Sequence, residues 1–173
     1  MGQHFGLDTT VLRYFNTYGP GQTPTPYVGV ITIFINRLLR GEAPVIYGDG
    51  EQRRDFVSVE DCVNINLFFL DHPGRSGIFN AGTGNAQSFN DVAVATVNTC
   101  RKAKGEPPLT LAAMRERAIV QYIPFPEDLK GRYQSYTQAD MSELRAAGYG
   151  APFLTVEQGV TRYCQKLLQK AGA

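Results

Sequence analysis

The chain has 173 residues, 43% of them hydrophobic, and its 17 basic and 16 acidic side chains leave a formal charge of +1. This length indicates one domain or a domain and a part, and the apolar content is sufficient for a buried core. The near-neutral charge argues against a nucleic-acid binder or a protein held on an anionic membrane. The most apolar run, residues 28–35, is too short to span a bilayer, and the first residues do not follow the pattern of a signal peptide.

Cysteine and histidine are sparse. Cys62, Cys100 and Cys164 are isolated and odd in number, which favours reduced thiols in the cytoplasm over disulfides or a zinc site. His4 and His72 are the only histidines. A histidine metal site or a Ser-His-Asp triad is therefore not expected.

The first predicted elements are a buried strand and a helix. β-Branched and aromatic residues fill 9–15, which is typical of a buried strand. A turn and a proline-spaced loop follow over 17–26. From Tyr27 to Leu38 apolar side chains recur at helical spacing, and Gly41 is placed to end the helix. The β-branched content would also allow a strand here, but the stop signals favour a helix.

Residues 44–58 are predicted to form a short strand, a tight turn and the start of a helix. Two glycines flank Asp49 in the turn, so the backbone can take positive φ and approach a ligand closely. Arg53 and Arg54 follow, and an arginine held beside free backbone N–H groups suits a phosphate, because its planar fork can bind two oxygens at once. The alternative is a surface turn with a solvated basic pair.

The next helix is predicted to begin at Ser58 as its N-cap and to end at 72–74. Asp61, three residues after Ser58, is expected to be the acidic partner of Ser58 in a capping box. Its expected buried face consists of Val59, Cys62, Val63, Leu67 and Leu70.

The rest of the chain mostly alternates strands and helices. Strands are expected at 78–81 and 120–125, and helices at 88–104, at 140–148 and from 155 onward, each helix opened by a polar residue with an acid or amide three positions later. Residues 109–117 are ambiguous and could form one or two helical turns. The alternation predicts an α/β fold.

Three segments carry a strand-to-loop signature (12–20), a diphosphate-binding turn with its arginine (47–57) and a strand before a helix (78–84). Together they resemble the extended short-chain dehydrogenase/reductases that epimerise or dehydrate nucleotide sugars. The tail, at 122–126 and 129–149, is similar to the ADP-glycero-manno-heptose 6-epimerases within that family.

The resemblance implies the carboxyl-terminal part of such an enzyme. Residues 1–20 and about 55–104 would supply the last strands of its Rossmann sheet, and residues 21–54 and about 105–173 a substrate-binding α/β subdomain. The chain lacks a Gly-rich cofactor turn at the start of a strand-turn-helix unit, and it lacks a Tyr-x-x-x-Lys pair. NAD or NADP is therefore expected to be bound mainly by the family's amino-terminal half, and this chain alone is expected to be inactive.

Carried over position by position, the resemblance implies substrate binding by Asn16, Tyr47, Gly48, Asp49, Gly50, Arg54 and Tyr133, and a cofactor contact through Thr17. It implies no catalytic residue and no metal ligand in this chain. Each role has a structural alternative. Asn16 could cap its own turn, Arg54 could pair with a carboxylate, and Tyr133 could be a half-buried packing residue.

The implied reaction of the whole enzyme is transient oxidation and re-reduction. Hydride leaves the sugar for NAD(P), and it returns to the other face of the planar carbonyl intermediate. Heptose 6-epimerases, which serve lipopolysaccharide biosynthesis, carry a second lysine in the loop after Gly-Pro. Residues 21–26 have none, and residues 101–117 look like an insertion. A UDP-hexose 4-epimerase or dehydratase, and a non-catalytic nucleotide-sugar-binding remnant, are therefore the alternatives. The full-length enzyme is expected to be a homo-oligomer.

Overall fold

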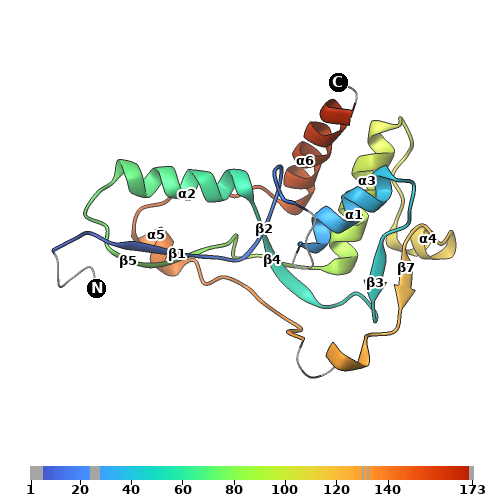
Figure 1. Ribbon diagram of the computed structural model, residues 1–173, viewed down its shortest axis with the longest axis horizontal. Coiled ribbons are helices and arrows are strands. Elements are labelled where there is room, and N and C mark those ends of the chain that lie inside the picture. The colour runs from blue at the N-terminus through green and yellow to red at the C-terminus, as the bar shows by residue number, and fades with distance from the viewer. Residues whose placement is uncertain (1–5, 24–27, 130, 132, 172–173) are drawn as a thin grey trace.

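The structure is a computed structural model that describes residues 6–23, 28–129, 131 and 133–171 (Figure 1). The strands are β1 (Thr10–Tyr14), β2 (Asn16–Tyr18), β3 (Val45–Tyr47), β4 (Arg53–Ser58), β5 (Gly77–Ala81), β6 (Ala86–Ser88) and β7 (Gln121–Ile123). The helices are α1 (Val30–Leu39), α2 (Val59–Asp71), α3 (Phe89–Ala103), α4 (Leu111–Glu116), α5 (Ser142–Ala146) and α6 (Val156–Ala171), with a 3₁₀ turn at Glu127–Leu129. In the described part of the chain, no helix has the length and apolar character needed to cross a membrane.

The strands form three small sheets, and most of their pairings are parallel. β1 pairs with β5, with Thr10 opposite Gly77, and β3 pairs with β7. β4 is the centre of the third sheet, where it runs parallel to β2 and antiparallel to β6. The predicted α/β class is confirmed.

Two hydrophobic cores lie at opposite ends of this arrangement (Figure 1). At one end α1, α3 and α6 pack together around side chains such as Phe34, Val92 and Val160. At the other end Ile65 of α2 and Phe79 of β5 pack with residues of the α5 region. β2 and β4 run between the two ends, so residues on these strands are placed beside both cores.

Several predicted helix boundaries are confirmed. Gly41, just past α1, takes a φ of +75°, which a glycine adopts without strain. Ser88 and Asp91 form a reciprocal capping box at the start of α3. Thr155 and Gln158 exchange the equivalent pair of hydrogen bonds before α6, at 3.0 and 3.2 Å. Tyr27 and the loop residues 24–26 lie outside the described residues, and so does the side chain of Leu168.

The prediction for residues 44–58 missed one element. The turn is followed by a buried strand, β4, before the helix, and Ser58 is the N-cap of that helix as predicted. The strand was missed because it opens with two arginines and an aspartate, residue types that are rare in buried strands. In the ambiguous region 109–117 the structure forms a helix, α4, capped by the Thr110 hydroxyl.

The prediction for the buried face of α2 was confirmed only at Cys62. The helix buries Cys62, Ile65 and Phe69, while Val63 and Leu67 are each 49% exposed. Both stripes are apolar and both have helical spacing, so the sequence pattern could not choose between them. β1, predicted as a buried strand, is also mostly exposed along its length.

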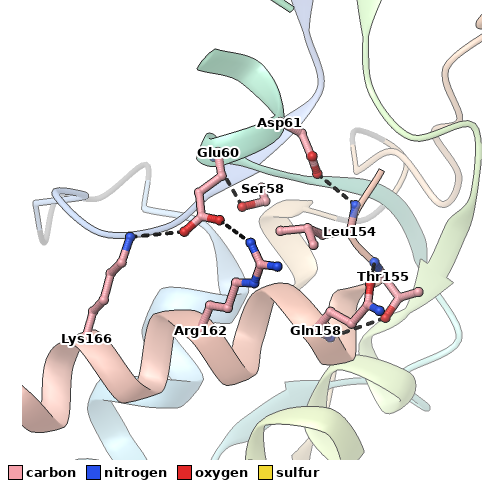
Figure 2. A network of polar contacts seen from close by, with 8 residues as sticks. All are labelled: Ser58, Glu60, Asp61, Leu154, Thr155, Gln158, Arg162 and Lys166. Atoms are coloured by element: carbon pink, nitrogen blue, oxygen red, sulfur yellow. Dashed lines mark hydrogen bonds and ion pairs between the residues drawn. The ribbon is translucent and has the colours of Figure 1, made fainter. Parts of the chain in front are cut away.

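Asp61 does not complete a capping box with Ser58, whose hydroxyl accepts from the Glu60 N–H instead. The buried carboxylate of Asp61 instead accepts a hydrogen bond from the Leu154 N–H at 3.0 Å (Figure 2). The neighbouring carboxylate, Glu60, forms ion pairs with Arg162 and Lys166 of α6 at 2.7 and 3.0 Å. The hydrogen bonds from these two cations lower the pKa of Glu60, whereas burial raises the pKa of Asp61. The start of α2 therefore anchors α6 and the segment before it.

A close approach of α6 to β2 strengthens this anchor. Tyr18 is buried, and a Cβ atom built on Gly159 would lie 1.9 Å from the Tyr18 hydroxyl oxygen. Burial, with the charge of Asp61 as the next cause, raises the pKa of Tyr18, so the phenol stays neutral. Only a glycine at 159 lets the helix lie this close to the strand.

We expect Gly159→Ala to destabilise the chain by about 1–3 kcal/mol, because the added methyl overpacks this contact. Gly150→Ala is the matched control, since a Cβ there meets no atom within 4 Å, and it should stay within about 0.5 kcal/mol of the parent. Urea denaturation of the three proteins measures the effect. Equal stability of Gly159→Ala and the parent would show that α6 does not pack against Tyr18.

Candidate functional site

A cavity of about 800 Å³ opens between α1 and the strands β2, β3 and β4, with the tail segment around Tyr133 at its edge. It is lined by Phe15, Asn16, Thr17, Tyr18, Gln22, Val28, Gly29, Val30, Ile31, Ile33, Phe34, Arg37, Val45, Tyr47, Arg54, Phe56, Phe89 and Tyr133. Four of the predicted substrate-binding residues, Asn16, Tyr47, Arg54 and Tyr133, thus meet in one cavity. They come from three strands and the tail, far apart in the sequence.

Arg54 is buried in β4, with 8% of the residue exposed, yet its guanidinium lines the cavity. Nη1 donates to the Arg53 carbonyl at 2.8 Å and Nη2 donates to the Gln134 carbonyl. Among the residues whose side chains the structure describes, no carboxylate lies within ion-pair distance of this guanidinium, so the predicted alternative of an ion pair is not observed with any of them. A buried cation whose hydrogen-bond partners are neutral carbonyls favours an anionic ligand.

Tyr133 stacks on Arg54, with the guanidinium carbon 4.9 Å from the ring centre. On its other side Tyr133 contacts Phe125 at 5.0 Å, and Phe125 contacts Tyr47 at 6.0 Å between ring centres. This row of aromatic rings joins the tail to β3 and flanks the cavity. A cation over an aromatic face is stabilised by the ring without being neutralised, so its positive charge can still attract an anionic ligand.

The tail reaches Arg54 because Asp55, the next residue, binds it. The Asp55 carboxylate is fully buried and accepts four hydrogen bonds: Thr83 N–H at 2.8 Å, Thr83 hydroxyl at 2.6 Å, Gly84 N–H at 2.9 Å and Ala139 N–H at 3.0 Å. Arg53 adds two backbone hydrogen bonds to Ser135 and Thr137, at 2.8 and 3.1 Å. One buried carboxylate thus fixes the tail beside the arginine of the cavity.

Asn16 and Thr17 of β2 also line the cavity. The Asn16 amide donates to the Asp55 carbonyl at 3.3 Å and contacts the Thr137 hydroxyl at 3.5 Å, so it bridges β4 and the tail rather than capping its own turn. The Thr17 hydroxyl donates to the Phe15 carbonyl at 3.3 Å and lies 3.6 Å from the Cys62 sulfur. Both residues are in place for a ligand, and their predicted roles stay predictions.

The turn 48–50 does not line this cavity. Gly48 and Asp49 line a second cavity, of about 600 Å³, with Arg115 and β7. Gly50 is buried, and a Cβ there would lie 2.3 Å from the Asn90 side-chain oxygen. The Asn90 amide in turn donates to the Asp49 carbonyl at 3.0 Å. In this structure the turn packs on the first turn of α3 and does not face the arginine.

Two features of the cavity were missed from the sequence. α1 begins at the cavity, which Gly29, Val30 and Ile31 line; within the described part of the chain the helix start has no side-chain cap, and its first turn has no acid. Such a helix start carries partial positive charge and suits an anion. Arg37 also lines the cavity, and its position at the edge of the apolar stripe of α1 was the signal available in the sequence.

The described residues do not fit a dinucleotide cofactor. In the Gly82–Gly84 turn, the N–H groups of Thr83 and Gly84 both bind Asp55, so neither is free for a pyrophosphate. Thr17 is the remaining candidate contact. Among the described residues there is also no group of three or more side chains that could hold a metal ion.

The model of the NAD dependent epimerase/dehydratase family matches residues 1–82, and the predicted resemblance to this family is thereby confirmed. The ADP-L-glycero-D-manno-heptose-6-epimerase of Thiobacillus denitrificans is 52% identical in an alignment 164 residues long that covers 91% of this chain and 49% of that enzyme. The chain thus spans about half the length of the curated relatives it matches.

Solved structures give the same picture. The UDP-N-acetylglucosamine 4-epimerase of Methanobrevibacter ruminantium, in complex with UDP-N-acetylmuramic acid, superimposes with a TM-score of 0.77 at 27% identity, over 98% of this chain and 49% of that one. The UDP-glucose 4-epimerase of Thermotoga maritima with UDP-glucose gives 0.73 at 30% identity, with the same coverage. The predicted fold, part of an extended short-chain dehydrogenase, is confirmed.

We expect Asp55→Asn to destabilise the chain by about 2–4 kcal/mol. The new amide nitrogen replaces an oxygen that accepts from two donors, and an unsatisfied buried polar group costs about 1–3 kcal/mol. Asp71→Asn, at the exposed end of α2, is the control and should be neutral. Urea denaturation measures both, and a neutral Asp55→Asn would show that the carboxylate does not hold the tail.

Proposed function

We propose that this chain is the nucleotide-sugar-binding part of an NAD(P)-dependent nucleotide-sugar epimerase. The observation that carries the proposal is the buried Arg54, which lines the cavity without a carboxylate partner among the side chains that the structure describes. A nucleotide sugar would supply an anionic partner for Arg54, because its diphosphate offers two oxygens that a guanidinium can bind together.

The other cavity residues have complementary roles in this proposal. The start of α1 adds partial positive charge for the diphosphate, and Tyr133 closes the site beside Arg54. Asn16 faces the sugar or its phosphate, Tyr47 lines the nucleoside side, and Thr17 lies toward the nicotinamide. For the turn 48–50 the role becomes indirect: it holds the end of β3 in place.

The cofactor supplies hydride acceptance and return, and residues outside this chain would hold most of it. We propose that residues 1–20 and about 55–104 belong with the cofactor-binding sheet, and that 21–54 and about 105–173 form the substrate subdomain. The exposed apolar side chains Val11 and Ile78 on the β1–β5 pair support this division, because parallel strands are normally covered on both faces. Alone, the chain would bind nucleotide sugar without turning it over.

ADP-glycero-manno-heptose is the first candidate substrate, supported by the 52% identity to the Thiobacillus denitrificans enzyme. We place the enzyme in lipopolysaccharide biosynthesis and in the cytoplasm, where the free thiols of Cys62, Cys100 and Cys164 would stay reduced. A homo-oligomer is the expected form of the full-length enzyme. A UDP-hexose is the second candidate, because residues 21–26 lack the lysine that the heptose 6-epimerases carry.

Arg54→Ala should weaken ADP and UDP binding to this chain by about 1.5–3 kcal/mol, as for hydrogen bonds to a charged group. Arg54→Lys should restore only part of the loss, because an ammonium cannot make two parallel bonds. Titration calorimetry measures both, with NAD(H) and NADP(H) as comparison ligands that should show no saturable binding. Unchanged ADP affinity in Arg54→Ala would remove Arg54 from the site.

An activity assay can distinguish the two candidate substrates. The enzyme to be assayed is a fusion of this chain to the amino-terminal half of the Thiobacillus denitrificans relative. Loss of a general acid–base group lowers a rate by about 10²–10⁴-fold, so we expect slow turnover of ADP-heptose relative to that enzyme. UDP-galactose is assayed in parallel. Fast and preferential ADP-heptose turnover would show that the missing lysine does not matter, and preferential UDP-galactose turnover would support the second candidate.

A further inference from the structure

Two cysteines face each other where α3 and α6 pack side by side (Figure 1). The contact between these helices includes the hydroxyls of Thr99 and Thr161, which lie 3.4 Å apart. Cys164 is 1% exposed in the core that both helices share, and Cys100 packs against the same core. The two thiols share a hydrogen bond. Thiols that hydrogen bond to each other already point at each other, which is the arrangement that a disulfide requires.

The two thiols differ in access to solvent. Cys164 is buried, whereas Cys100 is half-buried and lines a cavity of about 310 Å³. The charged residues that line this cavity are Glu42, Arg101, Lys104, Glu106 and Arg117. Basic residues outnumber acids there, and both acids already form ion pairs. A small reagent can therefore reach Cys100 first, at a place where a thiolate is favoured over a thiol.

The hydrogen bond between the thiols gives them different tasks. It lowers the pKa of Cys100 more than burial raises it, and the charge of Lys104 lowers this pKa further. The same hydrogen bond, together with burial, raises the pKa of Cys164. Because the thiolate is the form that reacts with an oxidant, Cys100 is the nucleophile and Cys164 its partner. Cys62 lies apart, 3.6 Å from the Thr17 hydroxyl, and burial raises its pKa.

We propose that Cys100 and Cys164 are a reversible redox site, at which a peroxide converts the two thiols into a disulfide between α3 and α6. The Cys100 sulfur attacks one oxygen of hydrogen peroxide, the O–O bond breaks, and the leaving hydroxide takes up the proton that Cys100 released. Cys100 is then a sulfenic acid. The Cys164 sulfur attacks the Cys100 sulfur, the S–O bond breaks, and the leaving hydroxide takes the Cys164 proton. The peroxide is reduced to two waters, and a reducing thiol reverses the disulfide.

The cross-link would act on the part of the chain that carries the tail. Residues 100–164 would become a closed loop, which contains β7, Tyr133 and the Ala139 N–H that binds Asp55. A link between residues distant in sequence lowers the conformational freedom of the unfolded chain, so the disulfide stabilises the folded one. The reaction does not require nucleotide binding, so this inference stands apart from the proposed function.

The test treats the intact chain at neutral pH with an equal amount of hydrogen peroxide and counts free thiols after unfolding. The parent should lose two of its three thiols, should give no cross-linked dimer on a non-reducing gel, and should recover all three with dithiothreitol. Trypsin separates the three cysteines into peptides 55–75, 76–101 and 163–166, and the last two should be found linked. The oxidised chain should also unfold at a higher urea concentration than the reduced chain.

Two variants complete the test. Cys62→Ala is the matched control and should form the same linkage. Cys164→Ala should form none, and the rate of Cys100 alkylation by iodoacetamide should reach half its maximum at a higher pH, because the thiolate has lost its hydrogen-bond donor. The peptide map of the parent needs no substitution, so it decides the question even where a variant folds poorly. Three thiols left after peroxide, a link to Cys62, a link between copies, or an unchanged alkylation profile in Cys164→Ala would each overturn the proposal.

Discussion

The buried carboxylate of Asp55 is the contact on which the site depends. It joins three segments that are distant in sequence: strand β4, the turn at 83–84 and the tail at 139. Four donors surround it, so the ionised form is satisfied without a basic partner. Because the tail is bound at this point, Gln134 and Tyr133 can reach the guanidinium of Arg54. The two backbone hydrogen bonds of Arg53 to Ser135 and Thr137 hold the same segment beside Arg54.

The second anchor lies on the opposite side of β4. There the first turn of α2 holds α6 through Glu60 and the segment before α6 through Asp61 (Figure 2). Gly159 lets α6 lie against Tyr18, next to the strand residues that line the cavity. The carboxyl-terminal third of the chain is therefore tied to the central strand twice. This arrangement explains how segments separated by more than a hundred residues can form one binding site, as with Asn16 and Thr137.

Much of the architecture could be predicted from local sequence, because capping pairs and glycine stops act over a few residues. The Ser88–Asp91 box and Gly41 are examples. The missed elements depend on tertiary contacts. β4 looks too polar for a buried strand until the tail satisfies its Arg54 and Asp55, and α2 carries two apolar stripes of which packing selects one. In the site, the family motif indicated Arg54 and Tyr133. Arg37 and the start of α1 could not be assigned, because only the fold brings α1 across from β3.

The central claim is that this cavity holds the diphosphate of a nucleotide sugar against Arg54. A crystal structure of the chain grown with ADP tests it most directly. The account predicts phosphate oxygens at about 2.7–2.9 Å from the Arg54 guanidinium nitrogens, the range of a charge-assisted hydrogen bond, with Tyr133 beside them. ADP bound away from Arg54, for example in the second cavity next to the turn 48–50, would contradict the account.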